Sequence, residues 1–201
     1  MSRWLKRSAA ALLALGLVSA CSGDGTWQTR DISGLVPDLA FALDDDRGRS
    51  VSAQDYRGKV KLLFFGFTHC PDVCNTTLAQ LAQTLRASGG GEDDVRVLFV
   101  TVDPARDSSA IMREYVQAFG PQFVGLRGDA AALDALARRY RVAYTLGKPD
   151  AQGQYDVNHS SAVFVFDREG RARVLFTGKE APDAMAQDLR RLILEARQGK
   201  G

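Results

Sequence analysis

One mostly apolar segment constrains the fold of this chain more than any other feature. Residues 59–67 read KVKLLFFGF and end at the polar sequence THCPD. A segment of this length, rich in aromatic residues, predicts a strand buried on both faces. A similar segment, VRVLFVTVD at 95–103, follows a stretch with helically spaced leucines over 78–85. This strand–helix–strand order predicts an α/β domain built around the two strands.

The rest of the chain continues the alternation of strands and helices. We expect a short strand at 39–43, helices at 107–120 and 129–142, and a short strand at 123–128. From residue 157 two strands are expected, joined by DREG, and a final helix begins at Pro182. This order predicts a central mixed β-sheet flanked by helices on both faces, with the working site at the carboxyl ends of the strands.

The N-terminus has the pattern of an export signal. Residues 1–20 combine a basic start with an apolar run shorter than the roughly 20 residues needed to span a bilayer. The sequence VSAC, which ends at Cys21, resembles the lipobox of bacterial lipoproteins and implies acylation of that cysteine. We therefore expect a lipoprotein signal peptide at 1–20, a lipid-anchored tether at 21–34 and one domain at 35–201.

The alternatives at the N-terminus are a plain secretory signal that ends beside a cysteine, and a retained membrane anchor. The expected location is the bacterial cell envelope, outside the cytoplasm, on a membrane facing the periplasm, where disulfides persist. A formal charge of +2 over 201 residues does not indicate a nucleic-acid partner.

The sequence CPDVC contains two of the three cysteines of the chain, Cys70 and Cys74. If Pro71 starts a helix here, the cysteines are i and i+4 and share one helix face. The helix N-terminus should lower the pKa of Cys70 above all, the charge of Asp72 opposes that effect, and the sequence leaves the net shift open. The pair can form a disulfide, or it can act as a soft metal chelate.

Metal binding needs at least one further donor, because two sulfurs are too few for a structural zinc site. Met112 and Met185 fall in apolar helical patterns, which leaves the two histidines. His159 precedes a strand expected beside the one that leads to Cys70, whereas His69 adjoins Cys70 and points differently. The alternative for His159 is a loop histidine bonded to the backbone. Two sulfurs and one imidazole fit copper, as Cu(I) or Cu(II), and also match one type of catalytic zinc site.

Three segments resemble the signatures of the Sco/SenC family of copper-binding proteins. They are FFGFTHCPDVCNTTLAQL, VTVDPARDSSAIMREYVQAFG and VNHSSAVFVFDREG, and the resemblance covers residues 35 to 195. It implies a thioredoxin-like fold, copper ligation by Cys70, Cys74 and His159, a disulfide between the same two cysteines, and a role in assembling copper centres of cytochrome c oxidase.

Four further residues within these signatures also need an interpretation. Asp103 and Asp107 match acidic positions of the family. A role as helix cap would explain Asp107. Asp103 and Asp72 are expected to lie next to the metal site or to contact a partner. Many members have proline after the second cysteine, where this chain has Asn75. The ligand set does not require that proline, so the departure concerns the fit to a partner or the redox potential.

Two functions follow from this site. The first is a copper metallochaperone that delivers copper in the assembly of a CuA-type centre of cytochrome c oxidase. Its expected partners are the copper-bearing oxidase subunit or another cuproprotein, a thiol-disulfide reductant, and the membrane through the lipid anchor. The alternative is a thiol-disulfide oxidoreductase that reduces the cysteines of a copper-site apoprotein, so whether the chain is an enzyme stays open. A peroxidase of the peroxiredoxin kind shares the fold, but its proline–threonine–cysteine arrangement is missing.

Overall fold

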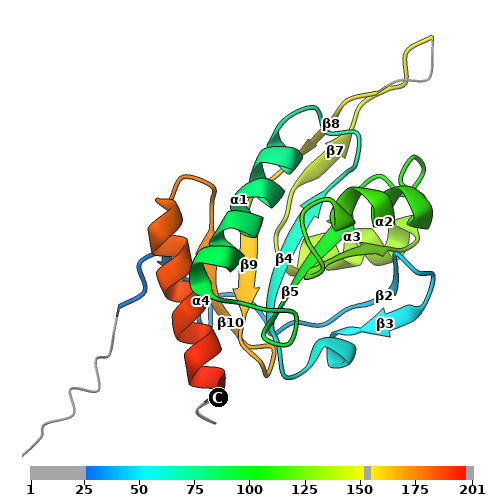
Figure 1. Cartoon of the computed structure of the whole chain (residues 1–201). Coiled ribbons are helices and arrows are strands. Elements are labelled where there is room, and N and C mark those ends of the chain that lie inside the picture. Colours follow the sequence, from blue (N-terminus) through cyan, green and yellow to red (C-terminus); the bar gives the residue numbers. More distant parts are fainter. Residues whose placement is uncertain (1–25, 152–154, 198–201) are drawn as a thin grey trace, which may run out of the picture.

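The structure is a computed structural model that describes residues 26–151 and 155–197. Its core is an eight-stranded sheet in the order β1-β10-β9-β4-β5-β6-β2-β3 (Figure 1). The strands are β1 (Arg30–Asp31), β2 (Ala42–Asp45), β3 (Ser50–Ser52), β4 (Val60–Gly66), β5 (Val95–Thr101), β6 (Phe123–Arg127), β9 (Val163–Phe166) and β10 (Ala172–Phe176). Strands β4, β5 and β6 are parallel, and β9 pairs with β4 in the antiparallel sense. The predicted central mixed sheet is therefore confirmed.

Strand β4 lies at the centre of the sheet, and all seven of its residues are buried. This burial explains why its sequence is nearly free of polar residues. The exception is Lys61, which is 1% exposed. Its Nζ donates to the carbonyl oxygens of Asp167, at 2.5 Å, and Arg168, at 2.8 Å, in the turn after β9.

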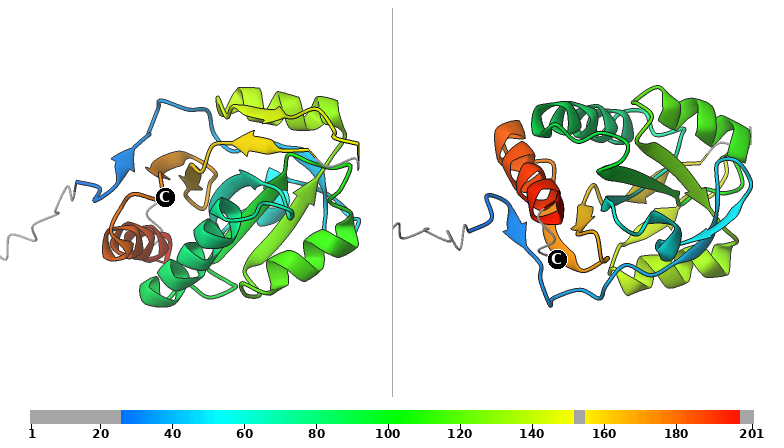
Figure 2. Two further views of the ribbon diagram at one scale, coloured as in Figure 1. Left: turned by 90° about the horizontal axis from the view of Figure 1, so that it is seen from above. Right: turned by 60° about the horizontal axis from the view of Figure 1, so that its bottom comes forward.

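Four helices cover both faces of the sheet: α1 (Val73–Ser88), α2 (Ser109–Gln117), α3 (Ala130–Arg139) and α4 (Pro182–Arg197). Helices α1, α2 and α4 lie on one face and α3 lies on the other (Figure 2). The crossovers through α1 and α2 step across the sheet in the same direction, so their common right-handedness places both helices on one face. The prediction of helices on both faces is confirmed.

Two features differ from the expected order of elements. In place of one strand at 39–43, the chain forms the β2–β3 hairpin, followed by a short 3-10 helix, η1 (Ala53–Tyr56). Leu39 is buried outside a strand, and its N–H donates to the carbonyl of Gly170 at 2.7 Å. The region before β9 contains a second small sheet of two antiparallel strands, β7 (Tyr144–Leu146) and β8 (Val157–His159). These four strands are only three or four residues long, which is too short for their alternation of side chains to predict them.

The described chain begins with a segment that packs on the domain. Strand β1 pairs with β10, and the Trp27 ring lies 4.2 Å from the guanidinium carbon of Arg191. The carboxylate of Asp188 in α4 accepts hydrogen bonds from the N–H groups of Gln28 and Thr29, at 2.9 and 2.8 Å. Residues 26–34 of the predicted tether are thus in contact with the sheet and α4, while the predicted signal peptide and Cys21 lie outside the described residues. Within the described chain, no helix has the length and apolarity needed to cross a membrane.

Candidate metal site

Two cysteines and a histidine meet at the carboxyl end of β4. Cys70 lies in the loop between β4 and α1, and Cys74 is the second residue of α1. His159 ends β8, four residues before Val163 of β9, which is paired with Phe64 of β4. The ligand atoms of the three residues lie within 4.8 Å of one another. The structure therefore brings together three residues that are separated in sequence. This agrees with the prediction that the strand after His159 lies beside the strand before Cys70.

The cysteines are not presented on one helix face as predicted. Helix α1 begins at Val73 with Asp72 as its N-cap, so Pro71 and Cys70 precede the helix. The sulfur of Cys70 instead turns back over the helix start and accepts a hydrogen bond from the N–H of Cys74 at 3.4 Å. Cys70 is 8% exposed and Cys74 is fully buried. The two thiols remain close because the sulfur of Cys70 occupies the place of a capping side chain.

His159 presents one nitrogen to the sulfurs. Its Nε2 lies 3.2 Å from the Sγ of Cys74, and its Nδ1 lies 3.0 Å from the carbonyl oxygen of Ser160. A carbonyl only accepts, so Nδ1 carries the proton and Nε2 keeps a lone pair directed at the cysteines. The rings of Phe64 and Phe67 pack against the imidazole, with centroids at 5.9 and 5.8 Å. Burial lowers the pKa of His159, which favours the neutral form that a ligand needs.

Burial has the opposite effect on the thiol of Cys74. It raises the pKa of this thiol, because a thiolate loses its hydration in the apolar interior. The sequence left the net shift at the cysteines open, and for Cys74 burial decides its direction. A bound metal ion would supply the positive charge that stabilises a thiolate at this position.

Gly66, the last residue of β4, makes room for the site. A Cβ atom there would lie 2.6 Å from a ring carbon of Phe99 and 2.7 Å from the Sγ of Cys74. Both distances are shorter than packed atoms tolerate, so the sulfur of Cys74 sits directly against the backbone of β4. The sequence offers a signal for this approach, since a lone glycine inside a strand pattern indicates close contact with another group.

Asp103 lies beside the site but does not reach the cluster. Its fully buried carboxylate bonds to the Nε of Arg106 through Oδ2 and accepts the hydroxyl of Tyr155 through Oδ1, at 2.5 Å. Tyr155 lies two residues before β8, the strand that carries His159. Neither Arg106 nor Tyr155 was singled out in the sequence, although Arg106 falls within the VDPARD segment. The role predicted for Asp103 stays a prediction, now with these two contacts defined.

Asp107 is not the helix cap that the sequence predicted. The N-cap of α2 is Ser108, and Asp107 is fully buried just before it. Its carboxylate accepts hydrogen bonds from the hydroxyls of Thr68, at 2.5 Å, and Thr101, at 2.6 Å. Asp107 therefore ties the loop after β4 to the end of β5. The Nδ1 of His69 lies 3.6 Å from Oδ1 of this carboxylate, and His69 is not one of the three residues of the cluster.

The first turn of α1 carries the two remaining residues considered in the sequence. Asp72 is exposed, and its carboxylate accepts a hydrogen bond from the hydroxyl of Thr76 at 3.1 Å. Asn75 accepts a hydrogen bond from the hydroxyl of Tyr115 in α2, at 2.9 Å. This chain thus connects α1 to α2 through the residue that stands where many Sco/SenC proteins have proline.

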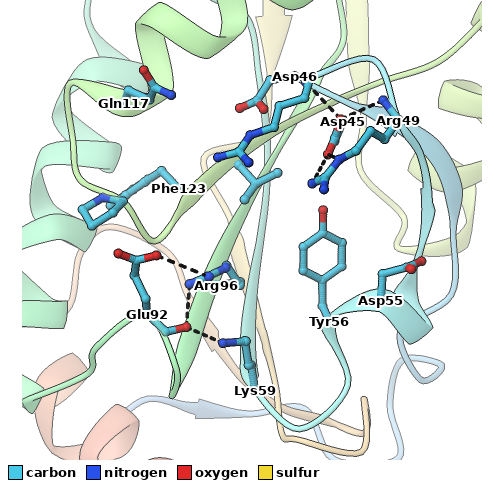
Figure 3. Close-up of a pocket in the computed structure, with 13 residues that line it drawn as sticks. Asp45, Asp46, Arg49, Asp55, Tyr56, Lys59, Glu92, Arg96, Gln117 and Phe123 are labelled. Carbon is cyan, nitrogen blue, oxygen red and sulfur yellow. Dashed lines mark hydrogen bonds and ion pairs between the residues drawn. The ribbon is translucent and has the colours of Figure 1, made fainter.

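A cavity of about 520 Å³ lies at the other end of the parallel strands (Figure 3). Its walls carry both signs of charge, and several of these charges pair with one another. Arg49 and Asp45 form an ion pair at 2.6 Å, and Lys59 donates to the carbonyl of Glu92 at 2.6 Å. No cysteine or histidine lines this cavity, so the donors for a soft metal lie at the Cys70 end of the described structure.

Fold and site together define a thioredoxin-like domain whose Cys-Cys-His cluster has the donors to hold one metal ion. Residues 35–194 match the model of the SCO1/SenC family, and the chain belongs to this family.

Relatives with names and structures agree with this assignment. The chain is 39% identical over 153 residues to the protein SCO2 homolog, mitochondrial, of Bos taurus, covering 75% of this chain and 58% of that protein. Among solved structures, Bradyrhizobium japonicum ScoI with copper bound is 39% identical with a TM-score of 0.69, covering 77% of this chain and 98% of that one. Arabidopsis thaliana ScoI with copper bound is 31% identical with a TM-score of 0.72, covering 79% and 98%. These structures bear out the thioredoxin-like fold expected here.

Proposed function

We propose that this chain is a copper metallochaperone that holds copper through Cys70, Cys74 and His159. The observation that carries the proposal is the convergence of the three ligand atoms within 4.8 Å at one end of the sheet. Two sulfurs and one imidazole nitrogen form a soft donor set that suits copper. Two relatives of this fold have solved structures with copper bound, which supports the choice of copper over zinc.

Each residue contributes a defined property to copper binding. The sulfurs of Cys70 and Cys74 are shielded from water, which protects bound copper and its thiolates from exchange and oxidation. His159 is held in the neutral tautomer with Nε2 facing Cys74, at 3.2 Å. The same arrangement couples metal binding to redox state, since the two sulfurs cannot form a disulfide and hold copper at once.

The proposed recipient is the copper-bearing subunit of cytochrome c oxidase, with a CuA-type centre as the destination. A solved relative, BsSco, is described as a member of the Sco family of cytochrome c oxidase assembly proteins. We propose that delivery takes place outside the cytoplasm at a membrane, with Cys21 as the lipidated anchor. A thiol-disulfide reductant would keep the cysteines ready for copper.

The alternative function, reduction of a partner's disulfide, requires a thiolate that the partner can reach. Cys74 is fully buried, and Cys70 is 8% exposed. Burial also raises the pKa of Cys74, which disfavours attack by its thiolate. These observations favour metal binding as the main use of the cysteine pair.

Copper titration of the reduced protein tests the ligand set. The variants are Cys70→Ala, Cys74→Ala and His159→Ala, and His69→Ala serves as control because His69 does not belong to the cluster. Thiolate-to-Cu(II) charge-transfer bands should vanish in all three ligand variants and persist in the control. Disulfide formation should survive in His159→Ala, since it needs only the cysteines. Full copper affinity in purified His159→Ala would overturn the three-ligand site.

Transfer tests the destination. The copper-loaded protein is mixed with the apo form of the oxidase subunit, and the optical bands of a CuA centre are followed. Appearance of those bands with loss of the donor's bands is expected. If instead the recipient's disulfide is reduced while no copper moves, the oxidoreductase function holds and delivery does not.

A further inference from the structure

His159 reaches the cysteines from a ribbon outside the central sheet. Strands β7 and β8 pair with each other, with Tyr144 opposite His159, and they extend beside the start of α1 (Figure 1). The base of this ribbon is attached to the domain by the hydroxyl of Tyr144, which bonds to Asp134 of α3. The position of His159 therefore depends on how the second strand of the ribbon, β8, is held.

A second attachment lies at the other end of β8. The hydroxyl of Tyr155 donates to Oδ1 of Asp103 at 2.5 Å, and the guanidinium carbon of Arg106 lies 3.8 Å from the centroid of the Tyr155 ring. The Nη1 of Arg106 also donates to the carbonyl of Tyr155, at 3.3 Å. Side chain and backbone of Tyr155 are thus both held by groups from the loop after β5.

This attachment ends on a buried carboxylate of the domain. Asp103 is fully buried, and each of its carboxylate oxygens is bonded, one to Arg106 and one to Tyr155. Arg106 also lies 5.8 Å from the ring centroid of Phe67, whose ring packs edge-on against His159. The same guanidinium therefore contacts both Tyr155 and the aromatic wall of the metal site. A charged acceptor in a buried place makes the hydroxyl bond of Tyr155 stronger than a neutral surface bond.

We propose that Tyr155 is a positioning residue for the third metal ligand. Through its hydroxyl bond to Asp103 and its contact with Arg106, it holds β8 so that the Nε2 of His159 meets the Sγ of Cys74. The proposal rests on the proposed function, because it takes His159 as a copper ligand. Loss of the hydroxyl leaves Tyr144 in place, so β8 loosens while the ribbon stays attached at its base.

The test is a double-mutant cycle of Tyr155→Phe and His159→Ala. Copper affinity is measured by competition, and imidazole ligation by nitrogen hyperfine coupling in paramagnetic spectra. Tyr155→Phe keeps the ring on Arg106 and should lower copper affinity about tenfold, as expected for loss of a hydrogen bond to a charged acceptor. In the His159→Ala background the same substitution should change copper affinity no further. Tyr56→Phe is the matched control, since Tyr56 lines the cavity at the other end of the domain.

The outcomes separate this inference from the function on which it rests. Unchanged copper affinity in His159→Ala would refute the ligand set itself. A weakened His159→Ala together with wild-type affinity and hyperfine coupling in Tyr155→Phe would overturn the positioning role alone. An equal loss in both backgrounds would also overturn it, because the hydroxyl would then act on general stability. If Tyr155→Phe proves unstable, Arg106→Lys in the same cycle tests the attachment from its other side.

Discussion

Replacing Gly66 by alanine places a methyl group between two atoms that already touch the backbone of β4. The new Cβ would lie 2.6 Å from a ring carbon of Phe99 and 2.7 Å from the Sγ of Cys74. Phe99 and Cys74 are both fully buried, so neither can move toward solvent. The substitution must therefore shift the strand, the ring or the sulfur of a proposed copper ligand.

The expected cost of this shift follows from measured effects of overpacking. One methyl group too many in a well-packed core costs about 1–3 kcal/mol, and the two short contacts here place Gly66→Ala near 2 kcal/mol. For a domain of this size that loss lowers the melting temperature by about 5 °C. The copper affinity should fall as well, because the sulfur of Cys74 can no longer occupy the same place relative to His159.

Urea unfolding and competitive copper titration measure the two effects separately. The slope of the urea transition should stay unchanged while its midpoint falls. Gly91→Ala is the control, since its Cβ would meet only the carboxylate of Asp94 at 3.8 Å, and its stability should stay within about 0.5 kcal/mol of the wild type. A Gly66→Ala protein with the wild-type midpoint and copper affinity would refute the close packing of Cys74 on β4.

Three further predictions concern parts of the structure that surround the site. Burial lowers the pKa of Lys61 to about 8, so above that pH the unfolded chain binds more protons than the folded chain. The unfolding free energy of the wild type, measured relative to Lys61→Met in urea titrations, should therefore rise by about 1–2 kcal/mol between pH 7.5 and 9.5. Both proteins carry Cys74, whose raised pKa cancels in this comparison, and a pH-independent difference would contradict the prediction. Tyr115→Phe and Asn75→Ala should each lower the unfolding free energy by about 1 kcal/mol. The double variant should lose no more than either single variant, because both substitutions remove the same hydrogen bond, and additive losses would contradict this prediction. Asp188→Ala removes the acceptor for two backbone N–H groups of the N-terminal segment. Hydrogen exchange of that segment should become faster while copper affinity stays the same. Unchanged exchange would show that β1 stays paired without the Asp188 carboxylate.

Much of the fold followed from the sequence because its signals are local. The buried strands β4 and β5 and the DREG turn before β10 were each predicted from residues within one segment. Helix α3 likewise lies within the predicted range 129–142, and the side chain of Asp129 caps its start. The β2–β3 hairpin and the β7–β8 ribbon were missed, since strands of three or four residues give too short an alternation of buried and exposed side chains to be recognised in the sequence.

The candidate site shows the same division. The types of donor were determined by the sequence, because the chain has only three cysteines and two histidines and Cys70, Cys74 and His159 are among them. We inferred that these three residues converge because the strands that carry them were expected to be neighbours in the sheet, and the structure places their ligand atoms together. The helix register at the cysteines was predicted wrongly, because the turn at Pro71 keeps Cys70 outside α1.

The amino-acid sequence by itself determined the class of domain, the central strands and the residues that offer donors for a metal ion, since strand burial and donor chemistry belong to the residue types themselves. Only the tertiary structure decided the environment of those residues. The depth of Cys74, the role of Asp107 as a tie between β4 and β5, and the attachment of Tyr155 to Asp103 and Arg106 all join segments that are distant in sequence. The physical reason is that burial and hydrogen-bond geometry arise from how elements pack, and the same side chains carry no such property before the chain has folded.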